Sequence, residues 1–172
     1  MTTKRISLAL VATALMFTLI AGLGSYFQVR AGGDEAPQLA GSWVDDITIV
    51  SGFNAGTTVK NLSTYSEGGG LVTLSVPVAP PLQSSPGHGT WIHKRGRKFA
   101  DTIVSFVYNP AGQLIATVKI HQLLTVSEGG DEYNGTASFD TFDPFGNLIP
   151  GLSACSTIHG RRINVEPGSA CP

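Results

Sequence analysis

The stretch that decides the fold runs from Tyr108 to Val126 and reads YNPAGQLIATVKIHQLLTV. It opens with the turn Asn109-Pro110-Ala111-Gly112, in which proline presets the backbone angle φ and glycine takes the left-handed position that ends a three-residue hairpin loop. After the turn, apolar residues recur at every second position, which is the period of a strand with one buried face. That face carries Leu114, Ala116, Val118, Ile120, Leu124 and Val126, and the other carries Lys119 and His121. The stretch therefore predicts a hairpin whose second strand is long and half-buried.

The rest of the chain from Gly41 onward has the same character. The turn pattern occurs again at Asp143-Pro144-Phe145-Gly146, and Lys94-Arg95-Gly96 fits it without the proline. β-branched and aromatic residues come in runs broken by glycine, proline, asparagine or aspartate, which indicates an all-β protein. The expected strands are residues 41–50, 57–66, 71–76, 88–94, 98–108, 113–127, 132–142 and 148–163.

Short links between these strands make successive strands antiparallel neighbours. A sheet of eight such strands gains by closing on itself, because closure removes both exposed edges. We therefore predict an all-β fold, an eight-stranded antiparallel up-and-down barrel, with a two-sheet sandwich as the main alternative. The Pro/Gly-rich loop from Pro77 to Gly89 is expected to be mobile and is a candidate lid.

The N-terminal segment has the layout of a secretory signal. Lys4 and Arg5 precede an apolar run, and the small residue Ala31 offers a cleavage site. We expect residues 1–31 to be a cleaved signal peptide, 32–40 a flexible N-terminal segment, 41–166 the barrel domain and 167–172 a C-terminal tail, in a secreted or periplasmic protein. An uncleaved membrane anchor is the alternative, because roughly 18 apolar residues can span a bilayer.

Charge and cysteine content narrow the classes of partner. Without residues 1–31 the chain has 8 basic and 12 acidic residues, which argues against nucleic acid and leaves no basic membrane-binding face. Cys155 and Cys171 are the two cysteines of an exported chain, so we predict a disulfide, worth about 3 kcal/mol for a loop of this length. No C-x-x-C spacing, P-loop or dinucleotide fingerprint is present, and we expect neither a metal nor a cofactor.

The hairpin around Gly96 is the source of the candidate site. If its turn pairs Trp91 with Phe99, one face collects aromatic, polar and aliphatic side chains. The turn at Asn109 adds two aromatic residues to the core-facing side, and the two strand phases agree if a β-bulge lies near Ser105-Phe106. The predicted ligand-facing residues are Trp91, His93, Phe99, Asp101, Ile103, Phe106 and Tyr108.

The first expected strand carries two adjacent acidic residues. Asp45 and Asp46 must lie on opposite faces of a strand, so they do not form a paired-carboxylate site. We expect both to be solvated or to lie at a strand end.

The two ends of the predicted barrel carry a resemblance. Gly41-Ser42-Trp43 opens the first strand and Arg161 or Arg162 lies near the end of the last, which resembles lipocalin-type barrels, where an arginine packs over the tryptophan to close the floor. Ser85-Pro86-Gly87-His88-Gly89-x-Trp91, the Asn-Pro-x-Gly turn and Ala154-Cys155-Ser156-Thr157 together resemble a group of exported bacterial proteins of unknown function with a predicted barrel. The resemblance implies a fold and a compartment, and no activity.

Three functions remain open. An eight-stranded barrel has room for one small apolar ligand in its mouth, which is the function we favour. The barrel could instead be a cyclase or isomerase type of enzyme, as barrels of similar appearance are, with His93 and Asp101 as an acid/base couple. In the third hypothesis Trp91, Phe99, Phe106, Tyr108 and Phe139 fill the interior, and the barrel is a structural or interaction module without a ligand.

Overall fold

The structure, a computed structural model, describes residues 38–76 and 81–168. All the regular secondary structure in that part of the chain is β-strand. They are β1 (Gly41–Gly52), β2 (Thr58–Tyr65), β3 (Gly70–Ser75), β4 (Gln83–Ser84), β5 (Gly87–Arg95), β6 (Lys98–Tyr108), β7 (Leu114–Val126), β8 (Glu132–Phe142) and β9 (Ala154–Arg162). Within the same residues, no helix has the length and apolar character needed to cross a membrane.

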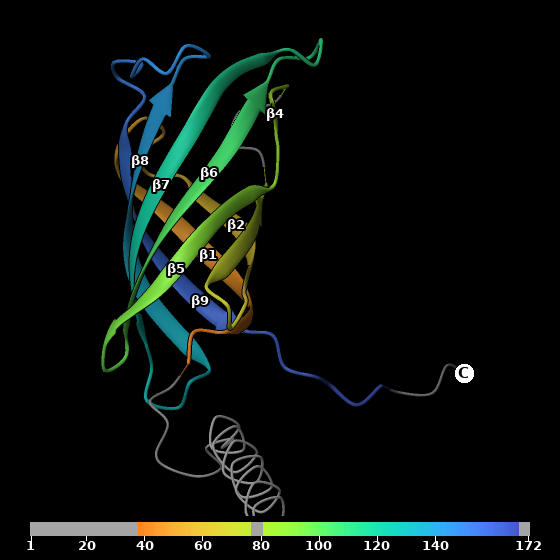
Figure 1. Ribbon diagram of the computed structural model, residues 1–172, viewed down its shortest axis with the longest axis vertical. Helices are drawn as coiled ribbons and strands as arrows, with labels where there is room; N and C mark the ends of the chain where they lie inside the picture. The colour runs from red at the N-terminus through yellow and green to blue at the C-terminus, as the bar shows by residue number, and fades with distance from the viewer. Residues whose placement is uncertain (1–37, 77–80, 169–172) are drawn as a thin grey trace, which may run out of the picture. The chain divides into compact units, whose positions relative to one another are not determined.

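Eight of these strands, all except the short β4, form a closed antiparallel barrel (Figure 1). Each strand pairs with the next along the chain from β1 to β9, except that β3 pairs with β5. β9 then pairs with β1 and closes the ring. The predicted eight-stranded up-and-down barrel is confirmed, and the sandwich alternative is wrong.

Both Asx-Pro-x-Gly turns are built as the sequence predicts. The Gly112 N–H donates to the Asn109 carbonyl at 2.9 Å, and the Gly146 N–H donates to the Asp143 carbonyl at 3.0 Å. Both glycines have positive φ, 77° and 88°, which a side chain would resist. The Asx side chain of each turn also accepts the backbone N–H two residues on, at 3.0 and 2.8 Å.

The expected loop from Pro77 to Gly89 is shorter than predicted. Gln83–Ser84 is strand β4, which pairs with the last two residues of β6, and Gly87 to Gly89 belong to β5. Residues 77–80 lie outside the described part of the chain.

The last strand also starts later than expected, at Ala154 rather than at residue 148. Leu148 makes an isolated bridge to Phe142, and the chain then turns at Pro150-Gly151, where Gly151 has a φ of 81°. The apolar residues before Ala154 therefore belong to the β8–β9 connection, because proline and a left-handed glycine interrupt the strand.

The strand registers decide which predicted residues face inward. His93 lies opposite Phe99 and Trp91 opposite Asp101, so the pairing of β5 with β6 is two residues from the expected one. A shift of two residues keeps the same side chains on the same face. The irregularity between β6 and β7 falls between Val107 and Tyr108 rather than near Ser105-Phe106.

Because the irregularity comes after Phe106, the prediction that Phe106 faces inward is wrong. The residue continues the regular alternation of β6, lies opposite Thr117, and is 43% exposed. Its ring is therefore on the outer face of the barrel.

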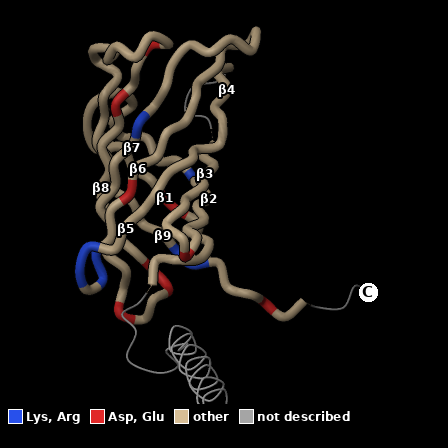
Figure 2. The backbone as a smooth tube through the Cα atoms, viewed as in Figure 1, with Lys and Arg blue, Asp and Glu red and all other residues tan. Residues whose placement is uncertain are grey.

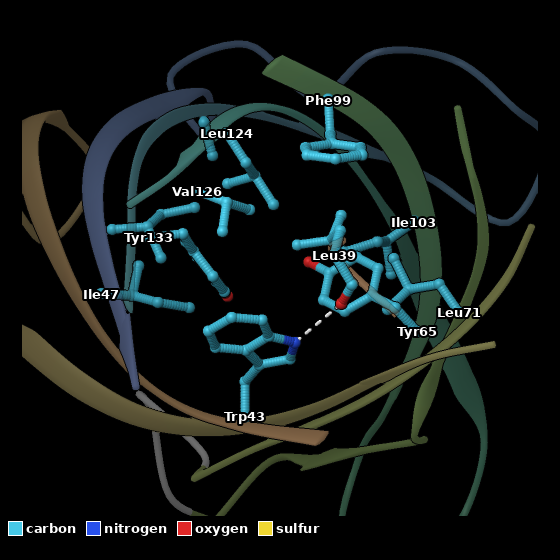
Figure 3. Packing of buried hydrophobic residues seen from close by; sticks show 12 residues of the cluster. Leu39, Trp43, Ile47, Tyr65, Leu71, Phe99, Ile103, Leu124, Val126 and Tyr133 are labelled. Carbon is cyan, nitrogen blue, oxygen red and sulfur yellow. Dashed lines mark hydrogen bonds between the residues drawn. The ribbon is translucent and has the colours of Figure 1, made fainter. Parts of the chain in front are cut away.

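One end of the barrel is closed by packed side chains (Figure 3). Leu39 and Trp43 are fully buried there, and the Trp43 indole donates to the Leu39 carbonyl at 2.9 Å. The Arg162 guanidinium lies over the Trp43 ring, with Cζ 4.2 Å from the ring centroid. It also donates hydrogen bonds to the carbonyls of Gln38, Ala40 and Gly130. Arg162 thus takes the position that the lipocalin resemblance implies, whereas Arg161 lies outside, 3.3 Å from Asp46.

The opposite end is less completely filled. The inward-facing side chains of Val59, Ile120 and Phe139 pack against the core yet stay partly exposed. The turns after β1, β6 and β8 lie at this end, as the direction of the strands in Figure 1 shows. We call it the open end, and the end around Trp43 the closed end.

Several predictions concern residues outside the described part of the chain. Residues 1–31, most of the segment 32–40, and Cys171 in the tail belong to this group. Signal cleavage and the disulfide between Cys155 and Cys171 therefore stay predictions. Cys155 itself is exposed on β9.

Candidate functional site

The most polar region of the barrel interior surrounds Asp45 on β1. Asp45 is 2% exposed, and its Oδ2 accepts hydrogen bonds from Asn61 Nδ2 at 2.7 Å and Ser63 Oγ at 2.8 Å, both on β2. Its Oδ1 accepts one from the Tyr133 hydroxyl of β8 at 2.6 Å. The expectation of a solvated Asp45 is wrong, because Trp43 faces inward and the two-residue period carries Asp45 to the same side.

Tyr133 reaches Asp45 because a glycine lies between them. In the sheet, Gly160 of β9 lies opposite both Asp45 and Tyr133. A Cβ atom at Gly160 would come within 2.3 Å of Cε1 and Cζ of the Tyr133 ring. The absence of a side chain at this position gives the ring its place across β9.

Asp46 shows the contrast with its neighbour. It lies on the outer face and forms salt bridges with Lys60 and Arg161. The hydrogen bond with Lys60 lowers the pKa of Asp46, whereas burial raises the pKa of Asp45 in spite of its three hydrogen bonds. Opposite faces for the two acids are therefore confirmed.

A second buried carboxyl group, that of Asp101, lies on β6. Asp101 is 5% exposed, and its Oδ2 accepts a hydrogen bond from the Tyr65 hydroxyl at 3.2 Å. The same hydroxyl is 3.5 Å from Oε1 of Gln122, which lies opposite Asp101 on β7. The other oxygen, Oδ1, is buried and has no hydrogen-bond partner among the described residues.

Burial raises the pKa of Asp101 to about 7, and the hydrogen bond from Tyr65 only partly opposes this effect. The nearby carboxyl group of Asp45 raises the pKa of Asp101 further. Burial also raises the pKa of both Tyr65 and Tyr133, so these phenols stay protonated and act as hydrogen-bond donors near neutral pH. Asp101 can therefore gain or lose a proton close to neutral pH.

The buried charged groups of the barrel are acidic, whereas the outer surface carries charges of both signs. Among the described residues, the buried charged side chains are Asp45 and Asp101, and no lysine or arginine is buried. The basic side chains lie on the outside, as in the β5–β6 hairpin with Lys94, Arg95, Arg97 and Lys98 (Figure 2). The interior is thus a site for a proton or a cationic group rather than for an anion.

A row of paired inward positions crosses the wall from Asp101 to Gln122, Ala137 and Ser156 on β9. Ser156 is 1% exposed, and its Oγ also has no hydrogen-bond partner among the described residues. A buried polar atom without a partner normally contacts a water molecule or a ligand. This row therefore carries two such atoms, one at each end.

The predicted acid/base couple is not assembled. His93 is exposed at the end of β5, where its Nε2 lies 2.7 Å from the Gly96 carbonyl and its ring packs 5.0 Å from the Phe99 ring. The hydrogen-bond partner of Asp101 is Tyr65 instead. The face shared by His93 and Asp101 was predicted correctly, but the register places them at different depths.

The other predicted ligand-facing residues divide between the core and the two ends. Phe99 and Ile103 are 5% and 1% exposed and belong to the packed core. Trp91 is half-buried near the closed end, 5.7 Å from Phe99, and its indole donates to the Ser66 carbonyl at 2.9 Å. Tyr108 is half-buried at the open end.

The outer face of the barrel carries a groove of about 710 Å³ that crosses β5 to β9. Most of the side chains along it point outward, and they include the exposed apolar residues Ile92, Leu123 and Val50 together with Cys155. The barrel therefore has apolar side chains in contact with solvent both along this groove and at the open end of the interior.

No protein-family model, curated protein or solved structure matches this chain.

Proposed function

We propose that the protein is an exported, calycin-like barrel that binds one small apolar molecule through its open end. The observation that carries the proposal is the contrast between the two ends of the interior. Val59, Ile120 and Phe139 face inward and stay partly exposed toward the open end, whereas Leu39 and Trp43 fill the closed end, where Trp91 is the partly buried apolar side chain. Partly exposed apolar side chains inside a barrel lose unfavourable contact with water when an apolar ligand covers them.

Export and the lipocalin likeness support the proposal from the sequence side. Residues 1–31 have the layout of a signal peptide, and the Trp43–Arg162 contact is the one expected of a lipocalin-type floor. A barrel closed at one end presents one entrance to a ligand.

Binding is tested with the neutral apolar dye Nile red, followed by its fluorescence. The variant Ala116→Trp adds a large side chain at an inward position near the open end, where Ala116 lies opposite Val107. We expect it to weaken dye binding about tenfold or more, because it occupies the volume of a ligand. Leu123→Ser removes apolar surface from the outer groove, and we expect it to leave binding unchanged.

The other functions are outcomes of the same titration. If the wild-type protein does not bind the dye, the barrel is a filled structural or interaction module. If Leu123→Ser abolishes binding and Ala116→Trp does not, the ligand site is the outer groove. Circular dichroism of both variants checks that the barrel is intact.

A further inference from the structure

The unpartnered oxygen of Asp101 extends this proposal to the class of ligand. We propose that the ligand of the barrel is an amphiphilic amine, with its apolar part at the open end and its ammonium group paired with Asp101. The inference rests on the proposed function, because it needs a ligand inside the barrel. It adds a polar group of defined charge to that ligand.

The first argument is the geometry of the carboxyl group. Oδ2 of Asp101 is held by Tyr65, so the carboxyl group has a fixed orientation, and Oδ1 is left without a donor among the described residues. A buried acceptor without a donor is less favourable than a paired one, because it has lost its hydrogen bonds to water. A ligand N–H group supplies that donor.

The second argument is charge. The described residues bury two carboxyl groups and no lysine or arginine, so the interior provides no cation of its own for Asp101. Arg162, which covers the closed end, is held by three backbone carbonyls and by the Trp43 ring. A carboxylate and an ammonium group form a stronger hydrogen bond than two neutral groups, so a cation satisfies this site better than an alcohol does.

The third argument is position. On β6, the inward neighbours of Asp101 are Phe99 toward the closed end and Ile103 toward the open end. Opposite Asp101 on β7 is Gln122, and the next inward residue of β7 toward the open end is Ile120. The row from Asp101 ends at Ser156, whose hydroxyl is the second buried polar group without a hydrogen-bond partner among the described residues. The residue before Ser156 in the row is the small Ala137. The polar row thus borders the apolar inner surface that the proposed function assigns to the ligand.

The test uses three probes with the same apolar chain: n-octylamine, n-octanol and n-octanoate. Their affinities for the wild-type protein are measured by calorimetry at pH 8. We expect the amine to bind about tenfold or more tightly than the alcohol, and the carboxylate to bind weakest, because the pairing is charge-assisted. Asp101→Asn is expected to remove the preference for the amine, while the outer-face variant Asp46→Asn is expected to keep it.

The outcomes separate this inference from the proposed function. Equal affinities for the amine and the alcohol, or a preference that survives in Asp101→Asn, overturn the role of Asp101 and leave an apolar ligand site in place. If none of the three probes binds, the proposed function fails as well.

A second measurement does not depend on folding of the Asp101 variant. At pH 6.5, pairing with the ammonium group ionises the Asp101 carboxyl group, so the wild-type protein should release protons when the amine binds and not when the alcohol binds. Calorimetry in two buffers with different ionisation enthalpies detects this release. Amine binding without it contradicts the pairing.

Discussion

Asp45 and Asp101 are buried to similar extents in the same barrel, 2% and 5% exposed, but their surroundings differ. Both oxygens of Asp45 are occupied, and its three donors come from two other strands, β2 and β8. Asp101 receives one hydrogen bond on one oxygen and none from the described residues on the other. The difference indicates that Asp45 joins strands to one another, whereas Asp101 is held by one oxygen and keeps its other oxygen, Oδ1, available for a hydrogen bond.

The largest effect is expected from Asp45→Ala. The substitution leaves the buried Tyr133 hydroxyl, Asn61 amide and Ser63 hydroxyl without their acceptor, and such losses together cost about 3–5 kcal/mol of unfolding free energy. Urea denaturation measures the change. Asp46→Ala is the matched control on the outer face and should cost much less, because water screens its exposed salt bridges. Equal losses in the two variants would contradict a structural role for Asp45.

An intermediate effect is expected from Gly160→Ala. The new methyl group would overlap the Tyr133 ring, so the ring must move and its hydrogen bond to Asp45 must lengthen or break. Overpacking of this kind costs about 1–3 kcal/mol. Gly129→Ala, where an added Cβ meets nothing within 4 Å, is the control in the same denaturation experiment. A Gly160→Ala protein as stable as this control would show that Tyr133 has room to move.

At acid pH the smallest effect on stability is expected from Asp101→Asn, because the amide replaces a protonated carboxyl group of nearly the same shape, and the effect should grow as the pH rises. A pKa of about 7 in the folded protein, above the usual 3.8, means that the folded state binds the proton more tightly. The contribution of Asp101 to stability is therefore fully present below about pH 4 and is lost as the pH rises to about 7.

Relative to the wild-type protein, Asp101→Asn should gain stability between these two pH values and keep a constant difference above them. Asp45 also has a raised pKa, so its contribution to stability falls with rising pH in the wild-type protein and in the variant alike. The comparison is made from denaturation curves at pH 4 to 8. Parallel pH profiles for the two proteins would rule out titration of Asp101 in this range.

The fold was largely accessible from the sequence because local signals determine it. The Asn109 turn and the alternation along β7 define the β6–β7 hairpin, and the Asp143 turn marks the end of β8. Repeated reversals of this kind lead to the barrel. Strand β4 was missed because two residues are too few for a periodic pattern, and the start of β9 was misplaced because Pro150-Gly151 was read as part of a strand.

The site was accessible only in part, because it depends on contacts between distant strands. The sequence contained a signal for Asp45: if Trp43 faces inward at the floor, Asp45 faces inward two residues later. Its partner Tyr133 is 88 residues away, and their meeting across Gly160 follows from the registers of β1, β9 and β8. Likewise, the turn pattern did not specify the two-residue shift in the β5–β6 hairpin. The shift places His93 opposite Phe99, which is still two positions along β6 from Asp101.

The three hydrogen bonds from Arg162 to the carbonyls of Gln38, Ala40 and Gly130 tie the beginning of the barrel to its last strand. The chain therefore enters and leaves the barrel on the same side, opposite the open end. A carrier protein, affinity tag or solid support joined before Leu39 or after Arg162 is attached behind the barrel, so its linkage does not cross the entrance. Immobilisation directly at either of these two points thus suits the binding measurements described above.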